Sequence, residues 1–249
     1  MVKKILFLLL VTGLVKINAQ SITIAAAADL RFALDDITRL YREKHQDVKI
    51  EVIYGSSGNL FQQISNQAPY DLFFSADVNF AAKLEELKLT SSKPRIYAVG
   101  HIVLWSISKD ISKGIALLTS EDVKKISIAN PEVAPYGKRA VESLKYYKLY
   151  DIIKDKIVKG DNVSQAAQFV LTGNADVGII ALSLALSPAM SSKGQFFLID
   201  EQSYSKLEQA YVILKKSEKK TELLDFVKFL ETKKIKDIFS KYGFNLPAK

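Results

Sequence analysis

The sequence predicts an α/β protein with two lobes, each a mainly parallel sheet flanked by helices. Short β-prone segments alternate with helical segments along most of the chain, an order typical of parallel sheets covered on both faces. Two longer β-prone segments, residues 97–106 and 207–214, can carry the chain from one lobe to the other and back. The length of 249 residues is enough for two small lobes.

The first lobe is predicted to begin with three strand–helix units. Its strands are expected at residues 21–27, 48–54 and 71–75, and its helices at about residues 30–41, 59–66 and 79–87. The first helix has apolar side chains at spacings of three and four, which place them on one face. Ligands of such sheets bind outside the carboxyl ends of the strands, which here are residues 27–29, 55–58 and 75–77.

The second lobe continues the alternation. Its strands are expected at residues 125–129 and 175–181, and its helices at about residues 138–147 and 163–171. Two C-terminal helices, at about residues 221–232 and 234–242, are expected to pack on the first lobe. The predicted boundaries assign residues 20–98 and 209–249 to the first lobe and residues 99–208 to the second. Two lobes joined by two crossings form a hinged cleft.

The N-terminal segment has the pattern of a cleaved signal peptide. Two lysines precede an apolar run over residues 5–15, and Ala19 ends an acceptable cleavage site. Lys16 interrupts the run after about a dozen residues, whereas a membrane-spanning helix needs about 20. We therefore expect residues 1–19 to be removed after Ala19, which places the mature protein in the periplasm.

The composition excludes several classes of function. The chain contains no Cys, so disulfides, thiolate zinc sites, iron–sulfur clusters and a cysteine nucleophile are excluded. It has only two His residues, which argues against a multi-histidine metal centre. The net charge of +8 falls to +5 when the three lysines of residues 1–19 are removed. The remaining lysines are scattered and accompanied by Asp or Glu, so we expect no nucleic-acid partner.

The loops at the strand ends contain candidate anion-binding groups. Residues 55–58 have the sequence Gly-Ser-Ser-Gly and lie between a predicted strand and a predicted helix. The first amides of a helix lack intrahelical acceptors, and the helix dipole favours negative charge there. Ser57 can cap this helix and donate its hydroxyl to a ligand. Further predicted helix starts lie at residues 28–29, 134–137 and 161–163, and together they predict a neutral cage rich in donors.

A cage of donors alone selects among anions by their protonation. A fully deprotonated tetrahedral oxyanion, such as molybdate or sulfate, accepts hydrogen bonds on every oxygen. Monohydrogen phosphate carries a proton that finds no acceptor in such a site, at a cost of about 1 to 3 kcal/mol. The carboxylate of Asp29 would weaken this selectivity if it entered the cavity. We therefore expect Asp29 to point away and to cap its own helix.

Six stretches carry a family resemblance. They are residues 25–30 (AAAADL), 54–60 (YGSSGNL), 68–77 (APYDLFFSAD), 130–137 (NPEVAPYG), 176–179 (DVGI) and 239–244 (FSKYGF). With these motifs in this order, the chain resembles the periplasmic molybdate-binding proteins of ABC-type molybdate importers over essentially all of its length after residue 19. The resemblance implies the type II periplasmic-binding-protein fold, in which the oxyanion is held between the lobes.

The resemblance also implies which residues hold the ligand. In that family, Ser hydroxyls and backbone amides from both lobes bind the oxyanion. Ser57 matches a hydroxyl donor, and Val163 matches an amide donor at a helix start. Tyr136 occupies a loop position that is Ala in some members and Tyr in others.

Two positions depart from the family pattern. Ala28, followed by Asp29, stands where the family often has Ser, so only backbone amides are available there. Ala181 stands where some members have Tyr, and we expect the hydroxyl of Tyr136 to replace the missing one from the opposite loop. The expected oxyanion site comprises Ala28, Asp29, Ser57, Tyr136, Val163 and Ala181. These residues would contact a metal only through the oxygens of the ligand, and no cofactor is expected.

By resemblance, the protein is a monomeric solute-binding component that captures molybdate or tungstate and delivers it to a membrane permease. A protein of the same fold for sulfate, phosphate or an organic acid remains an alternative, as does an interaction protein with a vestigial cleft. An exported serine hydrolase with Ser57 as nucleophile would need a base, and His45 and His101 are the only histidines. Residues 55–58 do not match the Gly-x-Ser-x-Gly elbow, and we expect no enzymatic activity.

Overall fold

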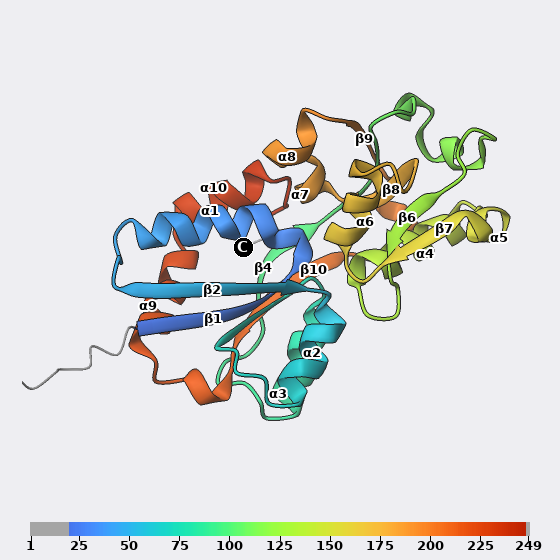
Figure 1. Ribbon diagram of the computed structural model, residues 1–249. Helices are drawn as coiled ribbons and strands as arrows, with labels where there is room; N and C mark the ends of the chain where they lie inside the picture. The colour runs from blue at the N-terminus through green and yellow to red at the C-terminus, as the bar shows by residue number, and fades with distance from the viewer. Residues whose placement is uncertain (1–19, 248–249) are drawn as a thin grey trace, which may run out of the picture.

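The computed structural model describes residues 20–247, which form two lobes, each built on a five-stranded sheet (Figure 1). The strand order is β2-β1-β3-β10-β4 in the first lobe and β7-β6-β8-β5-β9 in the second. The predicted signal peptide, residues 1–19, lies outside the described residues. Among residues 20–247, no helix has the length and apolar character needed to cross a membrane.

The first sheet contains the three strands predicted near the N-terminus, the strand that precedes the first crossing and the strand that follows the second. Its strands are β1 (Gln20–Ala27), β2 (Val48–Gly55), β3 (Leu72–Ser75), β4 (Arg95–Gly100) and β10 (Leu207–Ile213). Strand β1 pairs in parallel with both β2 and β3, whereas β10 is antiparallel to both β3 and β4. Four strands therefore run in one direction, and β10, which enters from the second lobe, runs in the opposite direction.

Helices cover both faces of the first sheet. They are α1 (Arg31–Arg42), α2 (Ser57–Ser65), α3 (Val78–Glu86), α9 (Thr221–Leu230) and α10 (Lys233–Lys241). Ile24 and Phe74 pack in one core with α1, α9 and α10, while the intervening Ala25 and Phe73 pack in another with α2 and α3. This alternation follows from the two-residue period of a strand. Figure 1 shows the two helical layers on opposite sides of the sheet, and it confirms that the C-terminal helices pack on the first lobe.

The second sheet has the same arrangement of strands. Its strands are β5 (Ile102–Ser106), β6 (Ile126–Ala129), β7 (Ile157–Gly160), β8 (Val177–Ala181) and β9 (Gln195–Leu198). Strand β6 pairs in parallel with β7 and β8, and β5 is antiparallel to β8 and β9. The reversed strand is again the one that arrives from the other lobe. Its helices are α4 (Pro135–Tyr146), α5 (Tyr150–Ile153), α6 (Val163–Leu171), α7 (Leu182–Ala185) and α8 (Pro188–Ser191).

The chain changes lobe at two places. Gly100 ends β4 in the first sheet, and Ile102 begins β5 in the second, so the predicted crossing at residues 97–106 is divided at His101. The return lies between β9 and β10, where His101 Nδ1 and Glu201 Oε1 are 3.0 Å apart and link the two crossings. The predicted boundaries between the lobes, after residues 98 and 208, remain a prediction.

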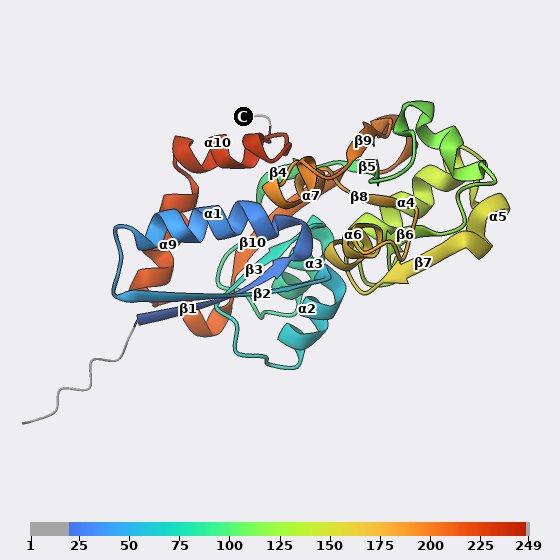
Figure 2. The same cartoon turned by 45° about the horizontal axis from the view of Figure 1, so that its top comes forward.

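Short 3-10 helices fill several of the connections. They are η1 (Ala28–Leu30), η2 (Ile111–Thr119), η3 (Lys154–Lys156), η4 (Glu201–Ser203) and η5 (Lys215–Ser217). Of these, η1 is the most relevant to function, because it joins β1 to α1 at the carboxyl end of the first sheet. Its residues are buried against α6 and α7 of the second lobe, which lie at the junction of the two lobes in Figure 2.

Candidate functional site

A small cavity lies where the carboxyl ends of the strands of the first lobe face the second lobe. The first lobe contributes the loops that follow β1, β2 and β3, and the second lobe contributes the starts of α4 and α6. The lining residues are Ala27, Ala28, Asp29, Gly55, Ser56, Ser57, Ala76, Ala134, Pro135, Tyr136, Asn162 and Val163. The space open to the centre of a water-sized molecule is about 10 Å³, close to the minimum for one water, so the cavity is nearly filled in this arrangement of the lobes.

The first lobe places Ser57 at the start of α2 with an uncommitted hydroxyl proton. Ser57 is fully buried, and its Oγ accepts a hydrogen bond from the amide of Ala76 at 3.0 Å. Among the described residues, no acceptor for the Ser57 hydroxyl is found, so the hydroxyl can donate into the cavity. The expectation that Ser57 caps α2 is wrong. Ser56 is the N-cap, since it has extended backbone and its Oγ accepts from the amide of Asn59.

The second lobe directs two helix starts at the same cavity. Asn162 caps α6 by accepting from the amides of Ser164 and Gln165, which leaves the amide of Val163 without an intrahelical acceptor. Pro135 occupies the first turn of α4, where its missing N–H costs nothing, and Tyr136 follows it. Together with α2, three helices of at least nine residues present their N-terminal ends to the cavity, and their dipoles favour an anion there.

Asp29 departs from the expectation that it points away and caps its own helix. Its side chain makes no capping bond, and it lines the cavity with only 1% of its surface exposed. Its Oδ2 instead accepts from the hydroxyl of Tyr136 at 3.0 Å and from Nε2 of Gln209 at 2.6 Å. The physical reason is that α4 and β10 bring two donors to a carboxylate that burial has deprived of water. Desolvation raises the pKa of Asp29 to about 6, although the bonds from Gln209 and Tyr136 and the backbone amide of Asp29 itself lower it.

The hydroxyl of Tyr136 is therefore engaged with Asp29 in this structure. Burial and the nearby Asp29 raise the pKa of Tyr136 well above its ordinary value, so the hydroxyl keeps its proton. Nε2 of Gln209 also donates to the Tyr136 hydroxyl at 3.1 Å, and Oε1 of Gln209 accepts from Tyr97 at 2.6 Å. A buried polar network thus extends from the cavity through β10 to β4. A direct contact between Tyr136 and a ligand remains a prediction.

Ala181 is not among the residues that line the cavity. It ends β8, and its fully buried side chain lies in the core of the second lobe. The structure brings the other five predicted residues together. Sequence reasoning missed the contributions of Gln209 and Ala76. The only signal for Gln209 is an amide side chain in a strand segment whose other residues, apart from Glu208, are hydrophobic.

Direct bonds join the lobes around the cavity. They are Ser164 Oγ to Ala28 O (2.9 Å), Ser183 Oγ to Asp29 O (2.7 Å), Gly58 N to Val133 O (2.8 Å) and the ion pair of Arg139 with Asp77 (3.4 Å). Gly58 and Val133 approach so closely that only glycine fits, because a Cβ at residue 58 would lie 2.7 Å from the Val133 oxygen. These contacts describe a closed arrangement of the two lobes.

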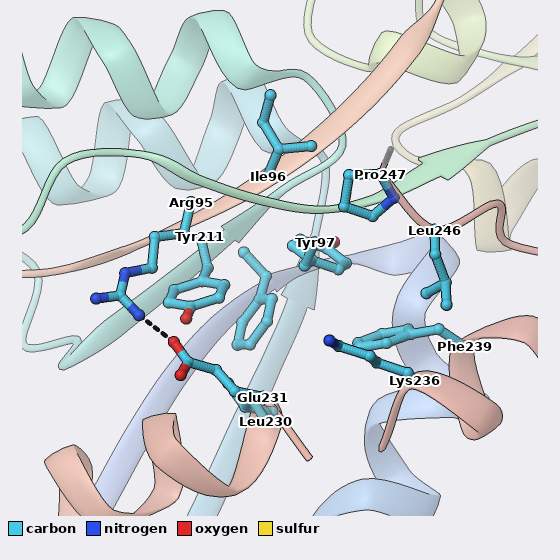
Figure 3. Close-up of a pocket in the computed structure, with 11 residues that line it drawn as sticks. Arg95, Ile96, Tyr97, Tyr211, Leu230, Glu231, Lys236, Phe239, Leu246 and Pro247 are labelled. Atoms are coloured by element: carbon cyan, nitrogen blue, oxygen red, sulfur yellow. Dashed lines mark hydrogen bonds and ion pairs between the residues drawn. The ribbon is translucent and has the colours of Figure 1, made fainter. Parts of the chain in front are cut away.

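A larger groove on the first lobe is less suited to a small anion. It has a volume of about 470 Å³ and lies between β4 and α10, with the aromatic rings of Tyr97, Tyr211 and Phe239 at its floor (Figure 3). The guanidinium of Arg95 at its edge is paired with Glu231. Within residues 20–247, no group of three or more Asp, Glu or His side chains could hold a metal ion.

The fold of two lobes with a small cavity between them is that of the solute-binding proteins. Residues 22–245 match the family model described as bacterial extracellular solute-binding protein, and the chain belongs to this family.

Individual relatives agree with this assignment. The chain is 34% identical to the molybdate-binding protein ModA of Azotobacter vinelandii over 92% of this chain and 91% of the relative. It is 33% identical to ModA of Rhodobacter capsulatus over 95% of this chain and 93% of the relative. The solved structure of the A. vinelandii periplasmic molybdate-binding protein superimposes with a TM-score of 0.85 at 28% identity, covering 91% of this chain and all of that one. The predicted fold class and the resemblance to this group of proteins are confirmed.

Proposed function

We propose that this protein is the extracytoplasmic solute-binding component of an ABC transporter and that it captures molybdate between its lobes. The observation that carries the proposal is the Ser57 hydroxyl, which is buried in a cavity faced by three helix starts and has no acceptor among the described residues. A tetrahedral dianion accepts from such donors on all its oxygens. Both ModA relatives are molybdate-binding proteins, which supports the choice of molybdate.

Capture proceeds by closure of the lobes. In an open form, each lobe would offer only part of the donor set to water and to the anion. The anion then shifts the equilibrium toward the closed form because only that form supplies donors from both lobes at once. The bonds from Ser164 to Ala28 and from Ser183 to Asp29 add to the stability of the closed form. The protein performs no reaction and needs no cofactor, since the metal arrives inside its oxyanion.

The remaining parts of the proposal follow from the family and from the N-terminal pattern. The mature protein is a periplasmic monomer cleaved after Ala19, and it delivers its ligand to a membrane permease. Tungstate is bound as well as molybdate, because its charge, shape and lack of protons are the same. The proposal includes no nucleic-acid partner.

A hydrolase is a poor fit to the surroundings of Ser57. The ring of His45 stacks on Tyr41 with 4.0 Å between ring centroids, and His101 bonds to Glu201 at the crossing between the lobes. Neither histidine lines the cavity. A second binding function has more support, because the carboxylate of Asp29 in the cavity could accept the proton of a monohydrogen phosphate.

Calorimetric titration of residues 20–249 with molybdate, tungstate, sulfate and phosphate tests the proposal. We expect molybdate and tungstate to bind one to one and more tightly than the other two. Ser57→Ala should weaken molybdate binding by about 10- to 150-fold, the equivalent of about 1.5 to 3 kcal/mol for a hydrogen bond to a charged group.

The matched control is Ser65→Ala. Ser65 lies at the other end of α2, and its buried Oγ has no partner among the described residues, so its removal should leave the affinity unchanged. Unchanged affinity in Ser57→Ala, or tighter binding of phosphate than of molybdate, would contradict the proposed function.

A further inference from the structure

The carboxyl group of Asp29 is only half satisfied. Oδ2 accepts from Tyr136 and Gln209, whereas Oδ1 is buried and has no hydrogen-bond partner among the described residues. Asp29 lines the cavity together with Ser57 and Val163. A buried carboxylate oxygen without a protein donor is costly, because the described residues offer nothing to replace its lost hydration. This oxygen is therefore a candidate to contact the ligand directly.

Within the described part of the chain, no cation balances the charge of Asp29. The elements packed against it present Tyr136 from α4, Gln209 from β10 and, through Gln209, Tyr97 from β4. From α7, Ser183 donates to the backbone oxygen of Asp29 and not to its side chain. The guanidinium of the nearby Arg31 lies over the ring of Tyr54 instead, 4.8 Å from its centroid. Among residues 20–247, no ion pair includes Asp29.

A dianion in the cavity changes the preferred protonation state of this group. An ionised Asp29 would place a negative oxygen beside a doubly negative ligand in a site that excludes water, where Coulomb repulsion is strong. A proton on Oδ1 removes that repulsion and converts the orphaned acceptor into a donor. Oδ2 can keep both of its bonds in this state, because it remains an acceptor. Burial already favours the neutral form, since it raises the pKa of Asp29 to about 6.

We propose that Asp29 binds the oxyanion in its protonated form, donating Oδ1–H to a ligand oxygen, so that one proton is taken up with each fully deprotonated anion. This inference rests on the proposed function and adds a proton-linked step to it. The bond from the carboxyl group to the ligand replaces the hydroxyl that the sequence lacks at Ala28. Anion affinity therefore depends on pH, although molybdate itself carries no proton at neutral pH.

The uptake of a proton by Asp29 predicts how the anion affinity changes with pH. Above the pKa of the free protein, binding must first protonate Asp29, so the affinity falls about tenfold for each pH unit. Below that pKa the group is already neutral, and the affinity becomes constant. For the unmodified protein, the slope of log affinity against pH is expected to change near pH 6.

The experiment is calorimetric titration of the mature protein with molybdate from about pH 6 to pH 8.5. Each pH is measured in two buffers of different ionisation enthalpy, which yields the number of protons taken up. At pH 7.5 we expect close to one proton per anion. Asp29→Asn keeps an acceptor for Tyr136 and Gln209 and supplies an amide donor in place of Oδ1–H. It should bind molybdate with no proton uptake and with an affinity that is independent of pH.

Asp122→Asn serves as the control variant, because the carboxylate of Asp122 is exposed in the second lobe and pairs with Lys109. It should keep the pH dependence of the unmodified protein. Tight molybdate binding without proton uptake would overturn this proposal and leave the proposed function intact. Tighter binding of phosphate than of molybdate at pH 8 would show that Asp29 acts as an ionised acceptor, and it would overturn both this proposal and the proposed function. Failure of all four anions to bind at any pH would overturn the proposed function itself.

Discussion

Gly58 offers a direct test of lobe closure, because it contacts the second lobe through its backbone alone. Its amide donates to the oxygen of Val133 at 2.8 Å, and a Cβ at this position would lie 2.7 Å from that oxygen and 2.9 Å from the Val133 Cα. Both neighbours are backbone atoms, which cannot turn aside as a side chain can. Gly58→Ala should therefore hold the lobes apart at this point in the closed form.

The cost can be estimated from the contact. Inserting a methyl group into a close-packed contact costs about 1 to 3 kcal/mol, which corresponds to about 5- to 150-fold in affinity. The open form has no such penalty, since Gly58 lies in the first turn of α2 with ordinary helical backbone. Alanine is the better helix former there, by up to about 1 kcal/mol. The variant should therefore bind molybdate more weakly without losing thermal stability in the absence of ligand.

Calorimetric titration measures the affinity, thermal unfolding measures the stability, and small-angle scattering with and without molybdate reports closure. Asn59→Ala is the matched control, because Asn59 is the next residue of the same helix and is exposed. Gly58→Ala with unchanged affinity would refute the reasoning, since the closed arrangement could then not depend on the contact with Val133. Weaker binding together with lower thermal stability would refute it also, because the damage would then lie within the first lobe.

Two further predictions concern buried polar groups. Tyr136→Phe removes a bond that lowers the pKa of Asp29, so the pH at which molybdate affinity begins to fall should move upward in the titration series. If that pH stays in place or moves down, the bond from Tyr136 does not lower the pKa of Asp29. Burial raises the pKa of Asp71, but the bonds that it accepts from Ser217, the amide of Thr23 and Lys220 outweigh burial and lower the pKa below the ordinary 3.8. The contribution of ionised Asp71 to the free energy of unfolding is present above pH 3.8 and is lost as the pH falls through the lowered pKa. Denaturant unfolding at pH 7 should show Asp71→Asn to be destabilised by about 1 to 3 kcal/mol, with a smaller difference at pH 3; an equal difference at both pH values would be inconsistent with an ionised Asp71.

The fold was predictable where periodicity is strong and local. The helix expected at residues 163–171 matches α6 at both ends. Its apolar spacing lies within these residues, and its cap, Asn162, directly precedes them. Strand β9 was not predicted. Its four residues are all exposed at the edge of the second sheet, so neither alternation nor a buried run distinguishes them. The 3-10 segment η2 was also missed, because Gly114 interrupts it with a φ of +58°.

The site was predictable only in its local parts. Ser57 and Val163 are helix starts that follow strands, and that placement is visible over a few residues. The orientation of Asp29 depends on Gln209, which is 180 residues away in the sequence, and on Tyr136, which is 107 residues away. A local capping rule predicts that Asp29 bonds to its own helix. Burial between two lobes overrides that rule, because the donors that reach Asp29 come from elements that local sequence cannot place.

A carboxyl group in the cavity and selectivity through donors alone are compatible if Asp29 carries a proton. With Asp29 neutral, the Ser57 hydroxyl, the helix amides and Oδ1–H are all donors, and a protonated ligand finds no acceptor among them. With Asp29 ionised, the same cavity contains one acceptor, and a monohydrogen anion can satisfy it. Discrimination between molybdate and phosphate should thus decrease as the pH rises above about 6, the pKa of Asp29. Asp29→Asn, whose amide cannot ionise, should keep the discrimination at every pH.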